Sequence, residues 1–204
     1  MTAIPTTRLS GKCWRFGDNI NTDLIMPGRV YDQPEAVQVA ATFADMRPGF
    51  SKQVAPGDVI VAGRNFGTGS SRPAARSLVR LGIACLAAEK INGLFLRNCV
   101  NFGLLAVECP GVTDAFAEGD TAGVDLDTWT ITNLDTGARC AVKPVPPRLL
   151  ALMVGGGVFP TLERDGWIVP IETPNINAWS GAAEVRDGIQ RKEKHEMRDI
   201  SQKT

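Results

Sequence analysis

The sequence predicts an α/β protein in which parallel strands and helices are followed by antiparallel strands. From Gly57 to Glu108, short apolar runs alternate with longer helical patterns, which is typical of βαβ units. After Cys109, apolar and polar residues alternate between turns rich in Asp, Asn and Gly, which favours antiparallel strands. The 204 residues, of which 44% are hydrophobic, can bury one sizeable core and leave room for an appendage.

The elements of the parallel part are expected in a regular order. Residues 12–16 (KCWRF) predict an early strand, and residues 33–46 (QPEAVQVAATFADM) predict a helix. Gly103 suits the end of a later helix, because glycine readily adopts the left-handed backbone of a helix cap. The βαβ units are predicted as strands at 58–63, 83–88 and 104–108 with helices at 73–81 and 91–102.

The second half of the chain is expected to be antiparallel and then helical. Strands are predicted within 121–133 and 138–145, joined by a turn from Asn133 to Gly137. Residues 146–154 (PPRLLALMV) predict a helix with proline in its first turn, which three following glycines end. We assign residues 1–172 to this domain and residues 173–204 to a polar, charged C-terminal extension.

Composition and charge exclude several kinds of partner. Lys and Arg number 22, as do Asp and Glu, so the net charge is zero; without a basic block, no nucleic-acid partner is expected. The N-terminus lacks the pattern of a signal peptide, and the longest apolar run, residues 149–159, contains three glycines. We therefore expect no membrane span and a cytoplasmic location.

The cysteines and the histidine limit the chemistry that this chain can perform. The single histidine, His195, lies in a charged tail and is assigned no role, which disfavours a Ser-His-Asp triad or a multi-histidine zinc site. The cysteines form no CxxC pair and mostly sit in apolar stretches, as buried, reduced thiols do. The five cysteines are Cys13, Cys85, Cys99, Cys109 and Cys140.

Chemistry is expected in residues 63–78, GRNFGTGSSRPAARSL, where a strand ends in a loop with three glycines and two serines before a helix. Backbone amides from Gly69 to Arg72, the positive end of the helix and the Arg72 guanidinium would together bind an anion. The loop lacks the Gly-Lys-Ser/Thr ending of a P-loop and the third glycine of the dinucleotide fingerprint. Simple helix capping is the alternative that the pattern leaves open.

Two further segments join this loop in a family resemblance. Together with GDNINTDLIMPGR at 17–29 and FLRNCVNFGL at 95–104, it resembles the small subunit of 3-isopropylmalate dehydratase and the mobile fourth domain of aconitases. The three motifs occur in the family's order, and the resemblance covers about residues 10–165. It implies a swivelling β/β/α three-layer domain, here with a C-terminal appendage.

The resemblance also implies roles for individual residues. Ser70 matches the family's catalytic base, which removes the proton beside a carboxylate, and Arg72 matches the arginine that holds a substrate carboxylate. Serine is a poor base in water, but helix-end amides and a guanidinium would stabilise its alkoxide in a site without water. The other carried-over residues are substrate-binding (Gly69, Ser71, Arg29, Arg97) or supporting (Thr22, Asp23, Asn65, Asn98, Asn101).

The dehydration implied by the resemblance uses a [4Fe-4S] cluster as a Lewis acid. The cysteines of this chain lack the close pairing of cluster motifs, so we expect the chain to bind no cofactor and no metal itself. In the family the cluster belongs to a separate large subunit. That subunit is the expected partner, a small dicarboxylate is the expected substrate, and the active site is expected at the interface.

Several positions depart from the family pattern and leave the substrate open. Pro73 and Ala74 stand where Glu and His usually follow Gly-Ser-Ser-Arg, and Gly93 stands where an arginine is common. The default substrate is 3-isopropylmalate, interconverted with 2-isopropylmalate in leucine biosynthesis. A 2,3-dimethylmalate or citramalate-type acid is the alternative within this enzyme class, and a non-catalytic anion-binding domain is the alternative outside it.

Overall fold

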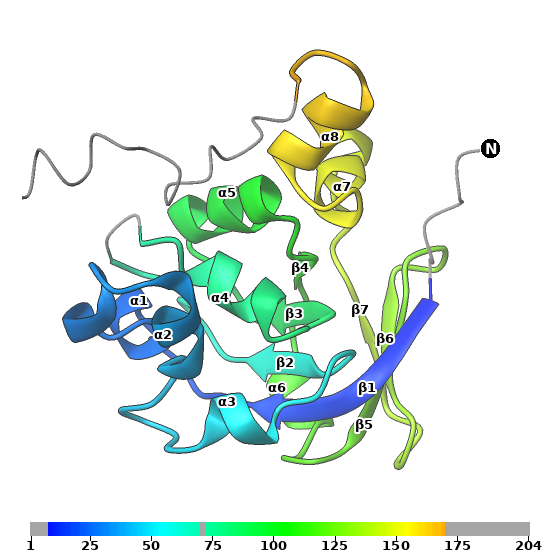
Figure 1. Cartoon of the computed structure of the whole chain (residues 1–204). Coiled ribbons are helices and arrows are strands. Elements are labelled where there is room, and N and C mark those ends of the chain that lie inside the picture. The colour runs from blue at the N-terminus through cyan, green and yellow to red at the C-terminus, as the bar shows by residue number, and fades with distance from the viewer. Residues whose placement is uncertain (1–7, 70–71, 170–204) are drawn as a thin grey trace, which may run out of the picture. The chain divides into compact units, whose positions relative to one another are not determined.

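The computed structural model of the chain describes residues 8–69 and 72–169. A curled seven-stranded sheet, with strand order β4-β3-β2-β1-β5-β6-β7, organises the part up to Trp167 (Figure 1). The strands are β1 (Arg8–Arg15), β2 (Val59–Ala62), β3 (Cys85–Ala88), β4 (Ala106–Glu108), β5 (Thr121–Asp125), β6 (Thr130–Asn133) and β7 (Arg139–Ala141). The predicted strand segments are therefore confirmed.

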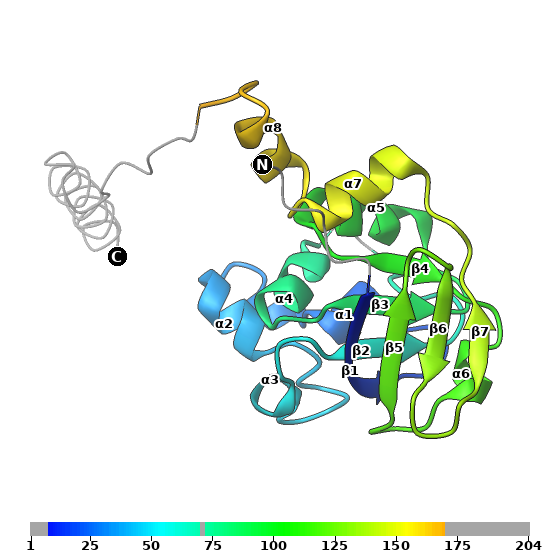
Figure 2. The same ribbon diagram turned by 90° about the vertical axis from the view of Figure 1, so that its right-hand side faces the viewer.

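The long strand β1 joins a parallel half of the sheet to an antiparallel half. Its residues Cys13–Arg15 pair with β2 in parallel, whereas Arg8–Lys12 pair with β5 in antiparallel register. The sheet curls until its two edges approach, and the backbone amide of Lys143, just after β7, donates to the carbonyl of Glu108 in β4 at 2.8 Å. Figure 2 shows the antiparallel half, β5 to β7, from the side.

Helices cover the parallel half. All four residues of β2 and of β3 are buried; α4 and α5 pack together beside these strands, while α6 contacts both strands and β7. The largest buried side chains here include Ile60, Leu78 and Phe95. The helices are α1 (Thr22–Ile25), the 3₁₀ turn η1 (Gly28–Val30), α2 (Glu35–Ala40), α3 (Phe50–Gln53), α4 (Ala74–Arg80), α5 (Gly93–Phe102), α6 (Val112–Ala115), α7 (Pro147–Val154) and α8 (Val158–Arg164).

Helix α5 ends as expected at Gly103, whose φ of 76° is left-handed. The helix predicted over 33–46 is too long, because α2 already stops at Ala40. Phe43 has a positive φ of 56° and turns its ring into an aromatic cluster, 4.3 Å from the Phe16 ring and 5.0 Å from the Phe50 ring. Burial of these rings outweighs the continued helical pattern of the sequence.

The C-terminal part also differs from the expectation. The three glycines at 155–157 end α7, but a further helix, α8, follows them directly. The compact unit ends at Trp167, and both the extension assigned to residues 173–204 and His195 lie outside the described residues. Within 8–69 and 72–169, no helix is long and apolar enough to cross a membrane.

Candidate active site

Three loops meet at the carboxyl ends of the adjacent strands β1, β2 and β3. We call residues 16–21, 63–69 and 89–92 the loop cluster. Isolated parallel bridges join Asn21 to Thr68 and Phe66 to Ile91. Because parallel neighbours end on the same side, these loops converge at the edge of the sheet where open α/β folds commonly bind ligands.

Hydrogen bonds fix the first two loops to each other. The Asp18 carboxylate accepts from the backbone amide of Arg64 at 2.6 Å, and the Asn65 side chain donates to the Asn19 side-chain oxygen at 2.9 Å. Both asparagines have positive φ values, 58° for Asn19 and 62° for Asn65. Asn65 thus lies in the loop cluster, where it contributes to the conformation of the loops.

Two glycines of the Gly-rich segment lie so close to neighbouring side chains that no other residue would fit at either position. Gly67 has a φ of 81°, and a Cβ there would lie 2.3 Å from the Cβ of Phe95. Gly69 has a φ of 112°, and a Cβ there would lie 2.9 Å from the Thr22 hydroxyl. Thr22 is buried, and its amide donates to the carbonyl of Thr68 at 2.7 Å. Thr22 therefore supports the loop immediately before the two serines.

Arg72 follows the two serines in the sequence, and residues between Asp23 and Tyr31 hold its side chain. Its guanidinium forms an ion pair with Asp23 and donates to the carbonyl of Met26 at 3.0 Å. The Tyr31 ring centroid lies 5.9 Å from the guanidinium carbon. The Arg72 side chain is 20% exposed and that of Asp23 is 58% exposed, so the pair sits at the molecular surface. The structure thus brings together Thr22, Asp23, Gly69 and Arg72, whereas Ser70 and Ser71 lie outside the described residues.

The remaining predicted residues lie on other features. Arg29 forms an ion pair with Asp45 at 2.6 Å, in which both side chains are about half exposed. Its hydrogen bond raises the pKa of Arg29 and lowers the pKa of Asp45. On α5, Arg97 and Asn101 are exposed, and the Asn98 side chain donates to the Leu94 carbonyl of the same helix at 3.2 Å. The substrate contacts of Arg29 and Arg97 and the supporting roles of Asn98 and Asn101 stay predictions.

Sequence reasoning missed part of the support for Arg72. The Met26 carbonyl is a backbone group and leaves no signal in residue type. Tyr31 is one of few aromatic residues near the motif 17–29, and the Asp18-Asn19 pair follows a glycine as turn residues do. The sequence could have indicated both features, because Tyr31 is the single tyrosine and Asp18-Asn19 after a glycine is a typical turn sequence.

The described cysteines do not fit an iron-sulfur cluster. Cys13, Cys85, Cys99 and Cys109 are buried in the core, and among residues 8–69 and 72–169 no three His, Cys, Asp or Glu side chains are grouped to hold a metal. Burial raises the pKa of both Cys13 and Cys85 to about 12, so these thiols are protonated at neutral pH. Their environment suits packing rather than metal ligation.

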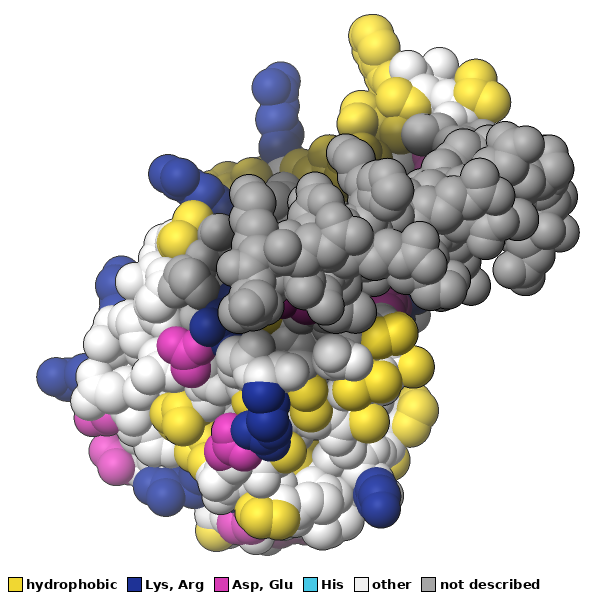
Figure 3. All heavy atoms as spheres, turned by 60° about the vertical axis from the view of Figure 1, so that its left-hand side comes forward, with side chains coloured by type: hydrophobic (Ala, Val, Ile, Leu, Met, Phe, Trp, Pro, Cys, Tyr) yellow, Lys and Arg dark blue, Asp and Glu magenta, His cyan; other side chains and the backbone are white. Residues whose placement is uncertain are grey.

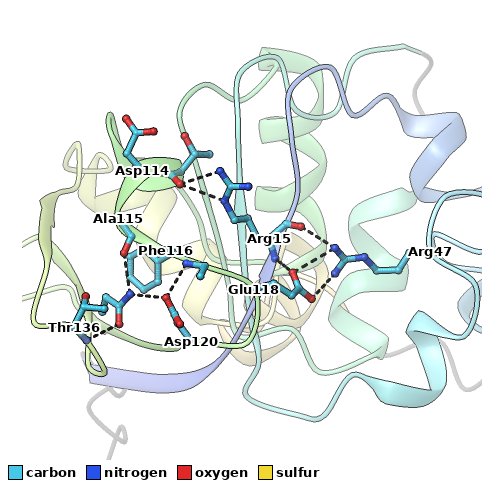
Figure 4. Close-up of a pocket in the computed structure, with 11 residues that line it drawn as sticks. Arg15, Arg47, Asp114, Ala115, Phe116, Glu118, Asp120 and Thr136 are labelled. Carbon is cyan, nitrogen blue, oxygen red and sulfur yellow. Dashed lines mark hydrogen bonds and ion pairs between the residues drawn. The ribbon is translucent and has the colours of Figure 1, made fainter.

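A cavity of about 760 Å³ lies elsewhere, between the end of β1, the segment before β5 and the turn after β6. Figure 4 shows that its arginines are directed at groups of the same chain. Arg47 donates to Glu118 at 2.8 Å, and Arg15 donates to the Thr113 carbonyl at 3.2 Å. Since protein acceptors already engage both guanidinium groups, we assign no ligand to this cavity.

The surface around α1 and α2 carries charges of both signs. Figure 3 shows basic and acidic side chains interspersed on this face of the molecule. Arg29 pairs here with Asp45, Arg72 with Asp23, and Arg80 with Glu35. These ion pairs join arginines of this face to neighbouring carboxylates.

Comparison with known proteins extends these observations. The family model of the aconitase C-terminal domain matches residues 14–111. The chain is 42% identical over 160 residues to the isopropylmalate/citramalate isomerase small subunit of Methanocaldococcus jannaschii, covering 76% of this chain and 94% of that protein. It is 39% identical over 158 residues to the homoaconitase small subunit of Thermus thermophilus, covering 76% of this chain and 96% of that one.

A solved structure shows the same architecture. The crystal structure of 3-isopropylmalate dehydratase (leuD) from Methanocaldococcus jannaschii matches with a TM-score of 0.73 and 29% sequence identity. The match covers 78% of this chain and 96% of that chain. The mixed α/β fold with a curled sheet is therefore shared with that protein.

Proposed function

The chain belongs to the family of 3-isopropylmalate dehydratase small subunits, and on this premise we propose that it supplies the proton-transferring side of a two-chain hydro-lyase. The observation that carries the proposal is the convergence of Thr22, Asp23, Gly69 and Arg72 at the carboxyl ends of β1 and β2. Gly69 and Arg72 bracket Ser70 and Ser71 in the sequence. The active site is then completed by a second chain.

Arg72 is proposed to bind one carboxylate of the substrate. A guanidinium presents several N–H donors in one plane and matches a carboxylate with two parallel hydrogen bonds. Asp23 and the Met26 carbonyl hold this group in a defined orientation, which lowers the entropic cost of binding. A substrate carboxylate binds beside Asp23 or takes its place.

Ser70 is proposed as the base that removes the proton from the carbon next to a carboxylate. In water its hydroxyl would hardly ionise, so the reaction needs an environment that stabilises the alkoxide. The neighbouring Arg72 guanidinium and backbone amides of the Gly-rich loop can do so once the partner chain excludes water. Gly69 and Ser71 are proposed to contact the substrate through their amides or the Ser71 hydroxyl.

A large subunit is proposed as the partner that carries the [4Fe-4S] cluster. The relatives are named small subunits, which implies a larger companion chain. The cysteines of this chain do not fit the cluster, because the described ones are mostly buried and unclustered. When present in the partner, the cluster would supply the Lewis acid for the departing hydroxyl.

The proposed substrate is a branched hydroxy dicarboxylate, with 3-isopropylmalate as the default. The relatives are named isopropylmalate/citramalate isomerase, 3-isopropylmalate dehydratase and homoaconitase small subunits, so their names do not fix one substrate. A 2,3-dimethylmalate or citramalate-type acid is the alternative. A side chain at Gly93 would meet open space, so this chain lacks a group there that could contact a substituent.

Anaerobic affinity purification of the full chain from its native host tests the partner and the cofactor. We expect a coloured complex with a large subunit and an iron content near four per complex. A colourless chain that recovers no partner under these conditions would contradict the proposal. Comparing kcat/KM of the complex for 3-isopropylmalate, 2,3-dimethylmalate and citramalate then identifies the substrate, and the highest value on isopropylmalate would support the default.

A further inference from the structure

Two cysteine side chains from opposite edges of the sheet face each other. Cys109 directly follows the edge strand β4, and Cys140 lies in the other edge strand, β7. The Cys109 thiol lies 3.5 Å from the carbonyl of Ala141, and the Cys140 thiol lies 3.7 Å from the carbonyl of Gly111. Each thiol thus contacts the backbone beside the other cysteine.

Few other bonds hold these edges together. Just beyond the strands, the Lys143 amide donates to the Glu108 carbonyl at 2.8 Å, and the Lys143 ammonium donates to the Glu108 carboxylate at 3.0 Å. Both edge strands are only three residues long. A covalent link between Cys109 and Cys140 would add a bond between the two edges of the curled sheet.

We propose that Cys109 and Cys140 form a redox-convertible thiol pair, which a peroxide oxidises to a disulfide joining the two edges of the sheet. One thiolate attacks a peroxide oxygen, the O–O bond breaks and hydroxide leaves, giving a sulfenic acid. The second thiol attacks that sulfur, forms the S–S bond and releases water. Overall, two thiols and one hydrogen peroxide give one disulfide and two waters, so two electrons pass from sulfur to oxygen.

The surroundings assign the first step to Cys140. Its side chain is partly exposed, whereas Cys109 is fully buried. Burial raises the pKa of both thiols, that of Cys109 to about 12, and the negative charges of Glu89 and Asp114 raise the pKa of Cys140 further. Oxidation is therefore expected to be slow at neutral pH.

This inference is independent of the proposed catalytic role. Neither thiol belongs to the residues that hold Arg72 or Gly69. The remaining thiols are less suited, because Cys13, Cys85 and Cys99 are all buried, whereas Cys140 is partly exposed. Oxidation is therefore expected to be specific to one pair.

The test oxidises the full-length, reduced chain with hydrogen peroxide at pH 8.5 and then blocks free thiols with a maleimide. Mass spectrometry is expected to show the loss of two hydrogen atoms, three labelled cysteines after unfolding, and a peptide linking Cys109 to Cys140. The Tm is expected to rise by about 5–10 °C and to return on reduction, because the disulfide constrains the unfolded chain.

Two variants test whether the disulfide forms between Cys109 and Cys140. Cys140→Ser is expected to abolish both the linked peptide and the Tm shift, whereas Cys13→Ala, a cysteine in another part of the core, is expected to keep both. A wild-type chain that retains five labelled cysteines after oxidation would overturn the proposal. A different cysteine pair, or a link between two chains instead of within one, would overturn it as well.

Discussion

Gly69 shows how one absent side chain shapes the candidate site. Its backbone has a φ of 112°, and the space where a Cβ would lie is taken by the Thr22 hydroxyl. The sequence predicted that Thr22 and the Gly-rich loop would act together, and the structure places them in contact. The reason is steric, since only glycine accepts both this conformation and this distance.

Gly69→Ala is expected to distort the loop that carries Ser70 and Ser71. The strained backbone and the contact with Thr22 should cost about 1–2 kcal/mol and lower turnover of the assembled complex at least tenfold. The matched control is Gly93→Ala, because a Cβ at Gly93 meets nothing and the residue begins helix α5. Steady-state kinetics should show normal turnover for the control, and equal effects of both variants would contradict this account of the loop.

Arg72→Lys is expected to weaken substrate binding in the complex. Lysine keeps the charge but loses the planar donors that hold Asp23, Met26 and the proposed carboxylate together. We expect KM to rise about tenfold. Arg80→Lys is the control, since Arg80 lies at the end of α4, the helix that follows Arg72, and pairs at the surface with Glu35. An unchanged KM for Arg72→Lys would remove Arg72 from the binding site.

At the residue scale, the sequence motifs indicated which residues of the candidate site lie near one another, but they did not predict every side-chain partner. Thr22, Asp23, Gly69 and Arg72 lie together in the structure, and their roles stay predictions. Arg29 instead pairs with Asp45, which lies 16 positions later and outside the motif at 17–29. Long, flexible side chains choose partners by tertiary proximity, which one sequence does not reveal.

At the element scale, periodicity placed most helices and strands but not their ends. Helix α2 stops at Ala40 because Phe43 turns into the aromatic cluster of Phe16 and Phe50. Helix α8 was not predicted, because the glycines at 155–157 indicated only the end of a helix, whereas they form a short turn between α7 and α8. A Cβ at Gly157 would lie 2.3 Å from the Asn101 carbonyl, so a contact with α5 dictates this connection.

The seam between β4 and β7 gives a pH-dependent prediction at this scale. Burial raises the pKa of Glu108, but hydrogen bonds from Lys90, Lys143 and the Ile91 amide outweigh burial and hold the pKa below its ordinary value. A carboxylate with a lowered pKa stabilises the fold above its unfolded pKa of about 4.3. That stabilisation disappears as the pH falls through the folded pKa.

Glu108→Gln is therefore expected to lower Tm by about 2–4 °C at pH 7, corresponding to about 1 kcal/mol. The difference from wild type should shrink as the pH falls through the lowered pKa of Glu108, because the wild-type carboxylate is then protonated. Asp45→Asn, in an exposed ion pair, serves as the control and should leave Tm almost unchanged. Thermal unfolding followed by circular dichroism from pH 3 to 7 measures both, and a constant difference across this range would contradict the assignment.

At the scale of the whole molecule, the order of elements was predictable and the curl of the sheet was not. Alternating patterns from residue 57 to 108 and after 109 predicted parallel and then antiparallel strands, and the structure confirms both. The meeting of β4 with β7 depends on twist accumulated over seven strands, which no local pattern encodes. Family membership and the hydro-lyase class, predicted from three motifs, are confirmed by the relatives.

The molecule also presents its candidate site at a surface, as half of an active site requires. Arg72 and Asp23 lie at the rim of the loop cluster rather than in an enclosed cavity. The cavity of about 760 Å³ is built from other residues that pair with one another. A second chain that covers the loop cluster would exclude water and so provide the setting that a serine base needs.

The most direct test of this account is the turnover of the anaerobically assembled complex with Ser70→Ala. We expect a loss of at least a thousandfold in kcat with the complex still formed and its iron retained, because no other base is proposed for the proton. Ser10→Ala, an exposed serine in β1, should behave as wild type. Turnover of Ser70→Ala within tenfold of wild type would contradict the central claim that this chain supplies the catalytic base.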